Sequence, residues 1–125
     1  MKYRVVKKGN PADPSAPKKK YANAVNAGTF TIKDITAEIA GRSSLTSGDI
    51  NSVLYNFTDV TPTFLKLGLS VKLGGLGTLR LVTLSEGVDE DKEFTAANIK
   101  GVKIVFTPSV ELKKSLENIT FEEEK

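Results

Sequence analysis

The sequence contains no cysteine, no histidine and no tryptophan. Without cysteine, a disulfide framework and a thiolate metal site are both excluded. The lack of histidine removes the usual zinc ligand and the usual general base near neutral pH. No stretch approaches the about 18 consecutive apolar residues of a membrane-spanning helix, and the basic N-terminus lacks the apolar core of a signal peptide. We therefore expect a soluble cytoplasmic protein with no membrane contact. No acid, base and nucleophile converge in the sequence, so we expect no enzymatic activity, no cofactor and no small-molecule substrate.

Charge is unevenly distributed along the 125 residues, although the net charge is only +3. Residues 1–20 contain seven Lys or Arg and one Asp, a net charge of +6. Residues 85–93 contain five acids and one lysine, a net of −4, and the last nine residues contain four glutamates and one lysine, a net of −3. Such asymmetry can indicate a side that faces a polyanion. Solvated tails and loops are the alternative, and charge alone does not separate the two.

The strongest apolar pattern lies in residues 45–68. Its apolar residues recur at helical spacing as one wide stripe, made of Ile50, Val53, Leu54, Phe57, Phe64 and Leu65. Thr46 is a natural N-cap and Gly68 a natural C-cap, so the pattern predicts one long helix. A small domain has difficulty covering so long a stripe with its own chain. We therefore expect a second copy to cover it, with a shared dimer core that contains Ile50, Leu54, Phe57, Phe64 and Phe106.

The residues before this helix predict strands and a second helix. Residues 3–8 favour a strand. Residues 18–30 allow either a second strand, paired with the first as a hairpin, or a disordered basic arm. Thr31 is the expected N-cap of a helix that ends near Gly41 or Arg42. With the long helix it would form an αα-hairpin.

The residues after the long helix predict a sheet and a short final helix. Residues 70–73 and 78–81 alternate polar and apolar around a glycine-rich turn, and residues 102–106 form a third strand. Residues 109–116 predict the last helix. Helices followed by a three-stranded antiparallel sheet indicate an α+β fold.

These residues resemble the HU and integration host factor family of bacterial histone-like DNA-binding proteins. In that family a strand of the form V-x-L leads into G-x-G, and the chain ends in F-x-P-x-x-x-L-K-x-x-[VL]. The matching residues are Val71, Leu73, Gly75, Gly77, Phe106, Pro108, Leu112, Lys113 and Leu116. The stretch KYRVVKKGNP is similar to the added β segment of the extended HU-like subfamily of Bacteroidetes. The resemblance divides the chain into a basic β extension (1–28), an HU-like domain (29–118) and an acidic tail (119–125).

The resemblance implies an intertwined homodimer that binds double-stranded DNA. In this family two β-arms reach into the minor groove, and a proline near each tip wedges between base pairs. Here residues 82–97, which correspond to the arm, contain neither arginine nor proline, and residues 86–93 are acidic. We therefore expect a short arm that does not wedge, with contacts to DNA phosphates made by other parts of the chain.

Basic residues outside the arm are the candidate DNA-binding residues. They are Arg80, Lys100, Lys103, Lys113 and Lys114 in or beside the sheet and last helix, and Lys7, Lys8, Lys18, Lys19 and Lys20 in the N-terminal extension. The predicted function is non-specific DNA binding by a nucleoid-associated, architectural protein. The alternative is a dimeric HU-fold module that has lost DNA binding and contacts proteins. No metal site is expected, because the acids of residues 89–93 lack the glycine and the distal glutamate of an EF-hand.

Overall fold

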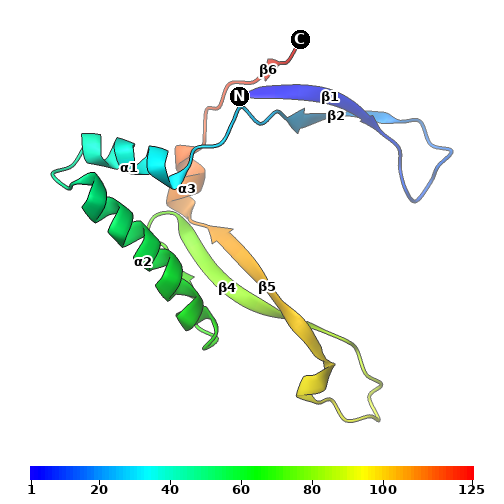
Figure 1. The fold of residues 1–125 in the computed structure, drawn as a ribbon. Coiled ribbons are helices and arrows are strands. Elements are labelled where there is room, and N and C mark those ends of the chain that lie inside the picture. Colours follow the sequence, from blue (N-terminus) through cyan, green and yellow to red (C-terminus); the bar gives the residue numbers. More distant parts are fainter.

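The computed structural model describes residues 1–125 and contains two small sheets and three α-helices (Figure 1). In chain order the elements are β1 (Lys2–Lys8), β2 (Lys19–Ala24), α1 (Ile32–Gly41), α2 (Ser47–Leu65), β3 (Val71–Lys72), β4 (Gly77–Ser85), the 3-10 helix η1 (Ala96–Asn98), β5 (Ile99–Pro108), α3 (Val110–Ser115) and β6 (Glu122–Glu123). The N-terminal sheet has the strand order β2-β1-β6, and the second sheet has the order β3-β4-β5. The predicted α+β class is confirmed. None of the helices combines the length and apolar character that a membrane crossing requires.

Helices α1 and α2 form the predicted αα-hairpin, and each begins at a threonine cap. The Asp34 carboxylate accepts hydrogen bonds from the Thr31 backbone N–H and the Thr31 hydroxyl, both at 2.9 Å. These bonds favour the ionised carboxylate and hold the pKa of Asp34 below its ordinary value of 3.8. The Thr46 hydroxyl accepts from the Asp49 N–H at 3.1 Å at the start of α2. Both N-caps expected from the sequence are confirmed.

Replacing Thr31 with alanine removes the capping hydroxyl of α1. We expect the free energy of unfolding to fall by about 1 kcal/mol. In the native chain, ionised Asp34 contributes stability at pH values above 3.8, and this contribution is lost as the pH falls through the lowered pKa. In the variant the pKa of Asp34 should move back toward its ordinary value, so less stability is lost on acidification. Thermal unfolding at pH 7 and pH 3 measures both effects. Thr29→Ala is the matched control, and equal effects of the two variants would contradict the capping role.

Strands β3, β4 and β5 form the predicted three-stranded antiparallel sheet. Strands β4 and β5 pair along their whole lengths, with one irregularity between Leu84 and Ser85. The alternation pattern predicts only residues 78–81 and 102–106 as strands, so both strands are longer than expected. The extra residues carry the β4–β5 hairpin away from the helices toward the acidic loop (Figure 1).

One face of this sheet is apolar, and the other, here called the basic face, carries its unpaired basic residues. Directly opposite residues in an antiparallel pair share a face, and the faces alternate along each strand. The register places Val71, Leu79, Leu81, Val102, Ile104 and Phe106 on the apolar face. The opposite face is mixed: it carries Lys72, Arg80 and Lys103 together with Val82, Leu84 and Val105. Ile104 is 62% exposed and Phe106 45%, so the chain's own helices leave much of the apolar face uncovered.

Strands β1 and β2 pair as a hairpin. Of the two alternatives for residues 18–30, the second strand is therefore confirmed and the disordered arm is wrong. Strand β2 ends at Ala24, before Phe30. Strand β6 pairs in parallel with the first residues of β1, so the acidic C-terminal residues belong to this sheet. The hairpin has no extensive contact with the helices or with the second sheet (Figure 1).

The core of the single chain is small. Only four of the 125 residues are buried, and Ile50 and Leu65, both on α2, are its buried hydrophobic side chains. A second stripe on α2 recurs at helical spacing and is 45–63% exposed; it consists of Val53, Phe57, Val60 and Phe64. Helix α2 therefore has one apolar side covered by its own chain and a neighbouring apolar side that is open.

Candidate nucleic-acid interface

The basic face of the second sheet brings two predicted DNA-binding residues together. Arg80 lies opposite Val105 and Lys103 lies opposite Val82, so the two cations occupy diagonal positions on one face. Such positions are about 7–8 Å apart in antiparallel sheets. Lys72 lies one row further along the same face. None of the three strands contains an acidic residue, so nothing on the sheet neutralises this basic strip.

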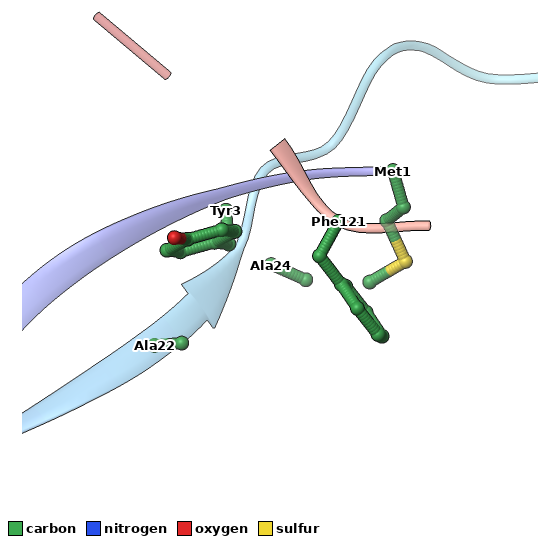
Figure 2. Close-up of a pocket in the computed structure, with 5 residues that line it drawn as sticks. All are labelled: Met1, Tyr3, Ala22, Ala24 and Phe121. Atoms are coloured by element: carbon green, nitrogen blue, oxygen red, sulfur yellow. The ribbon is translucent and has the colours of Figure 1, made fainter. Parts of the chain in front are cut away.

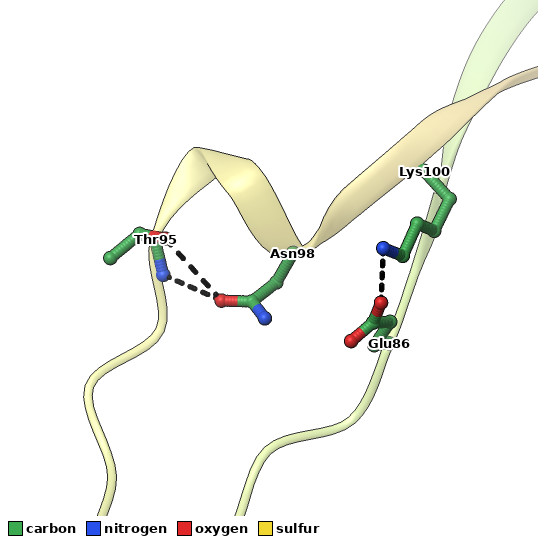
Figure 3. Close-up of polar contacts among 4 residues, drawn as sticks. All are labelled: Glu86, Thr95, Asn98 and Lys100. Carbon is green, nitrogen blue, oxygen red and sulfur yellow. Dashed lines mark hydrogen bonds and ion pairs between the residues drawn. The ribbon is translucent and has the colours of Figure 1, made fainter.

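Lys100 is not part of the basic strip. Its ammonium group forms an ion pair with the Glu86 carboxylate where the arm leaves the two strands (Figure 3). On the returning segment of the arm, the Thr95 N–H donates to Asn98 Oδ1 at 3.0 Å and caps the start of η1 (Figure 3). The loop residues 85–93 retain a net charge of −4. The arm therefore presents acidic groups and one neutralised lysine, which suits contact with DNA poorly.

Lys113 and Lys114 lie exposed in the last turn of α3. Ser109 fixes the start of this helix against the β3–β4 turn. Its N–H donates to the Leu76 carbonyl at 3.0 Å, and its hydroxyl donates to the Gly75 carbonyl. Neither lysine forms an ion pair. The two cations are therefore held on an anchored helix and are available to an anion.

The N-terminal hairpin places four lysines in two directly opposite pairs. Lys7 lies opposite Lys20, and Lys8 lies opposite Lys19. The two pairs point to opposite faces of the hairpin, since neighbouring residues alternate along a strand. None of the four lysines forms an ion pair. Like charges directly opposite each other are destabilising in antiparallel pairs.

A cavity of about 330 Å³ lies at the loop end of the hairpin, and its lining includes Lys8, Lys19 and Tyr21. The Lys8 ammonium nitrogen is 5.8 Å from the centre of the Tyr21 ring, within the range of a cation–π contact. Lys18 immediately precedes β2 in the chain. The loop end of the hairpin is therefore a concentrated cationic surface.

The other end of the N-terminal sheet has an apolar face. Met1, Tyr3, Ala22, Ala24 and Phe121 line a cavity of about 500 Å³ there (Figure 2). Phe121 comes from the segment that leads into β6 and points to the same side as Met1. One face of the sheet is apolar at this end.

No three His, Cys, Asp or Glu side chains gather closely enough to hold a metal ion.

Comparison with known proteins decides the family. A family model described as "HU domain fused to wHTH, Ig, or Glycine-rich motif", or HU-HIG, matches residues 1–123. The chain belongs to the HU-HIG family. The predicted resemblance to HU proteins is thereby confirmed, and the N-terminal extension falls inside the match.

One solved structure similar to this HU-HIG chain is a Bacteroides vulgatus protein that is provisionally described as a bacterial DNA-binding protein. It is 15% identical, with a TM-score of 0.63 over 98% of this chain. The HU-HIG chain covers 47% of that protein, so it spans about half of its length. At this identity the similarity concerns the fold. The comparison with curated protein sequences finds no match.

The HU-HIG structure groups the predicted cations into three places: the sheet strip, the end of α3 and the hairpin. It separates Lys100 from all three. The sequence prediction missed Lys72, although the alternation of residues 70–73 already placed it on a different face from Val71. It also missed the grouping of Lys2 and Arg4 with Glu122 and Glu124, because that grouping depends on strand pairing between the two ends of the chain.

Proposed function

We propose that this HU-HIG chain binds double-stranded DNA as a homodimer. It contacts phosphates without sequence preference and acts as an architectural protein of the nucleoid. The two opposed lysine pairs of the N-terminal hairpin carry the proposal. A protein gains nothing in stability from placing Lys7 opposite Lys20 and Lys8 opposite Lys19 without acids nearby. A polyanion removes this repulsion when it binds, so the arrangement favours the bound state.

The basic strip of the second sheet supports the same function. Arg80 and Lys103 extend from regular strands, so the backbone fixes their spacing before any ligand arrives. They lie on the face opposite the apolar one, so burial of the apolar face leaves them in solvent. Lysine and arginine on a rigid, acid-free surface favour phosphate contacts, which carry no sequence information.

The homodimer is inferred from the exposed surface. A folded monomer of 13.5 kDa exposes roughly 6,500 Å², whereas this chain exposes 10612 Å². The excess is roughly 4,000 Å² per chain, or roughly 8,000 Å² for two chains, which is enough for an obligate dimer interface, since these bury about 2,000–5,000 Å² or more in total. Of the residues expected in a dimer core, Ile50 is already buried and Phe57, Phe64 and Phe106 are 45–49% exposed. A second copy would cover these rings.

A dimer also doubles the cationic surface. Seven Lys or Arg from residues 1–20 of each copy give fourteen in the pair. The acidic arm lacks arginine and proline, so it supplies neither phosphate contacts nor a wedge between bases. The hairpin and the sheet strip take over DNA binding from the arm.

A salt titration with a random-sequence duplex tests this proposal. Micromolar or tighter binding is expected at low salt, and the affinity should fall steeply and linearly on a log–log plot as salt rises. Duplexes of unrelated sequence should bind equally. The absence of any binding at low salt would refute DNA binding and leave a dimeric protein-interaction module.

The double variant Arg80→Gln/Lys103→Gln tests the sheet strip. We expect the slope of log K against log salt to become shallower by about 1.8 per chain, because each lost phosphate contact removes about 0.9. Lys100→Gln is the control, since Glu86 already neutralises that lysine. A change in slope of about 0.9 from Lys100→Gln, half of that expected for the double variant, would contradict the assignment.

A further inference from the structure

The acidic C-terminal residues are joined to the basic N-terminal strand by backbone hydrogen bonds. The N–H of Glu122 donates to the Met1 carbonyl at 3.1 Å, and the N–H of Glu124 donates to the Tyr3 carbonyl at 2.8 Å. The N-terminal ammonium group donates to the Thr120 carbonyl at 2.9 Å. The two ends of the chain therefore meet as paired strands.

The pairing places carboxylates on one face of the hairpin, here called the cationic side, which carries Lys2, Arg4, Lys8 and Lys19. Glu122 is the register partner of Lys2, and the Glu124 carboxylate forms an ion pair with Arg4 at 3.0 Å. Residues at matching positions share a face, so Glu122 and Glu124 lie on the same side as Lys2 and Arg4, whereas Glu123 lies on the other side. On the cationic side the glutamates lie beside Lys2 and Arg4. They do not reach Lys8 and Lys19 at the loop end.

We propose that residues 120–124 are a built-in competitor of nucleic acid for the N-terminal part of the hairpin. This inference rests on the proposed DNA-binding function and adds its regulation. In the DNA-free chain the tail pairs with Arg4 and lies beside Lys2. A duplex that first engages the uncovered lysines at the loop end then displaces the tail and gains two further cations per chain.

The contact between the tail and the hairpin is weak enough for a duplex to displace it. The paired segment is short, and the Arg4 and Glu124 side chains are 65% and 34% exposed, so solvent and salt screen their attraction. Phe121 lies beside Met1 and Tyr3 on the apolar side but is 66% exposed, so it adds little to the contact (Figure 2). The tail is therefore held by a few backbone hydrogen bonds and one solvent-screened ion pair.

Glu124→Gln tests the competition, and Glu123→Gln is its matched control. Both variants remove one negative charge from neighbouring residues, but only Glu124 faces Arg4. In the duplex titration at low salt, Glu124→Gln is expected to bind roughly three- to tenfold more tightly than the native chain, with a salt slope steeper by about 0.9 per chain. Glu123→Gln should bind within twofold of the native chain. Equal gains from both variants would show a general charge effect and overturn the competition.

Hydrogen exchange of the tail provides a second measurement. The Glu122 and Glu124 amides should be protected in the DNA-free protein and should lose protection when a duplex is added. Protection that persists at saturating duplex would refute displacement.

Deletion of residues 120–125 separates this inference from the proposed function. If the native chain and the deletion variant bind a duplex equally, DNA binding stands and the competition is wrong. If only the deletion variant binds, the competition is supported. If neither binds, the DNA-binding proposal fails and the competition fails with it.

Discussion

Replacing Phe57 with aspartate is expected to leave the chain without a stable fold. Phe57 lies in the open apolar stripe of α2 and is 49% exposed in the single chain. In the proposed homodimer it lies in the shared core, where loss of the ring alone costs about 3–5 kcal/mol. An unpaired carboxylate in that core adds a desolvation penalty. Because a native domain of this size is stable by only about 5–15 kcal/mol, the variant should lose both the dimer and its cooperative unfolding transition.

Light scattering and circular dichroism measure the two expected losses. Tyr55→Asp is the matched control: it introduces the same charge into the same helix, at a position that is 59% exposed. Tyr55 lies two residues from Phe57 and therefore on nearly the opposite side of α2. The control should remain a folded dimer. A compact, well-folded monomer from Phe57→Asp would contradict the shared core.

Local signals were sufficient to predict the helices. Thr31 and Thr46 cap α1 and α2 as expected, because a capping bond depends only on residues within one turn. The apolar spacing of α2 identified Ile50 and Leu65, which are the buried hydrophobic residues of the chain. The same spacing does not tell which part of the stripe is covered by the chain itself and which part is open. That division depends on the packing of α1 and the sheet against α2.

The pairing of the C-terminal residues with β1 could not be predicted from the sequence. The residues of β6 have neither alternation nor β-forming side chains, and an acidic run of this kind normally predicts a solvated tail. Its pairing with β1 depends on where α3 leaves the C-terminal residues. Similarly, charge identified Lys100 as a candidate for DNA contact. Its ion pair with Glu86 arises only because β4 and β5 bring the two ends of the arm together.

Replacing the four opposed hairpin lysines with glutamine is expected to weaken DNA binding while leaving the protein at least as stable. The variant is Lys7→Gln/Lys8→Gln/Lys19→Gln/Lys20→Gln. Because the two pairs point to opposite faces, a duplex contacts the two lysines of one pair. Loss of these two phosphate contacts should make the salt slope shallower by about 1.8 per chain and reduce the affinity at low salt on the order of a hundredfold. The two opposed pairs no longer repel each other, so the melting temperature should stay the same or rise.

The hairpin variant should bind DNA less tightly while its melting temperature stays the same or rises, which distinguishes loss of an interface from loss of the fold. A control variant with the same change in net charge replaces four lysines outside the three cationic groups, namely Lys33, Lys66, Lys92 and Lys125. If binding depends on the hairpin surface, this control should retain most of its affinity and salt slope. If the control loses as much affinity as the hairpin variant, net charge alone determines binding, and the hairpin has no special role. Because the native hairpin holds like charges together without acids between them, we expect the hairpin variant to lose far more affinity than the control.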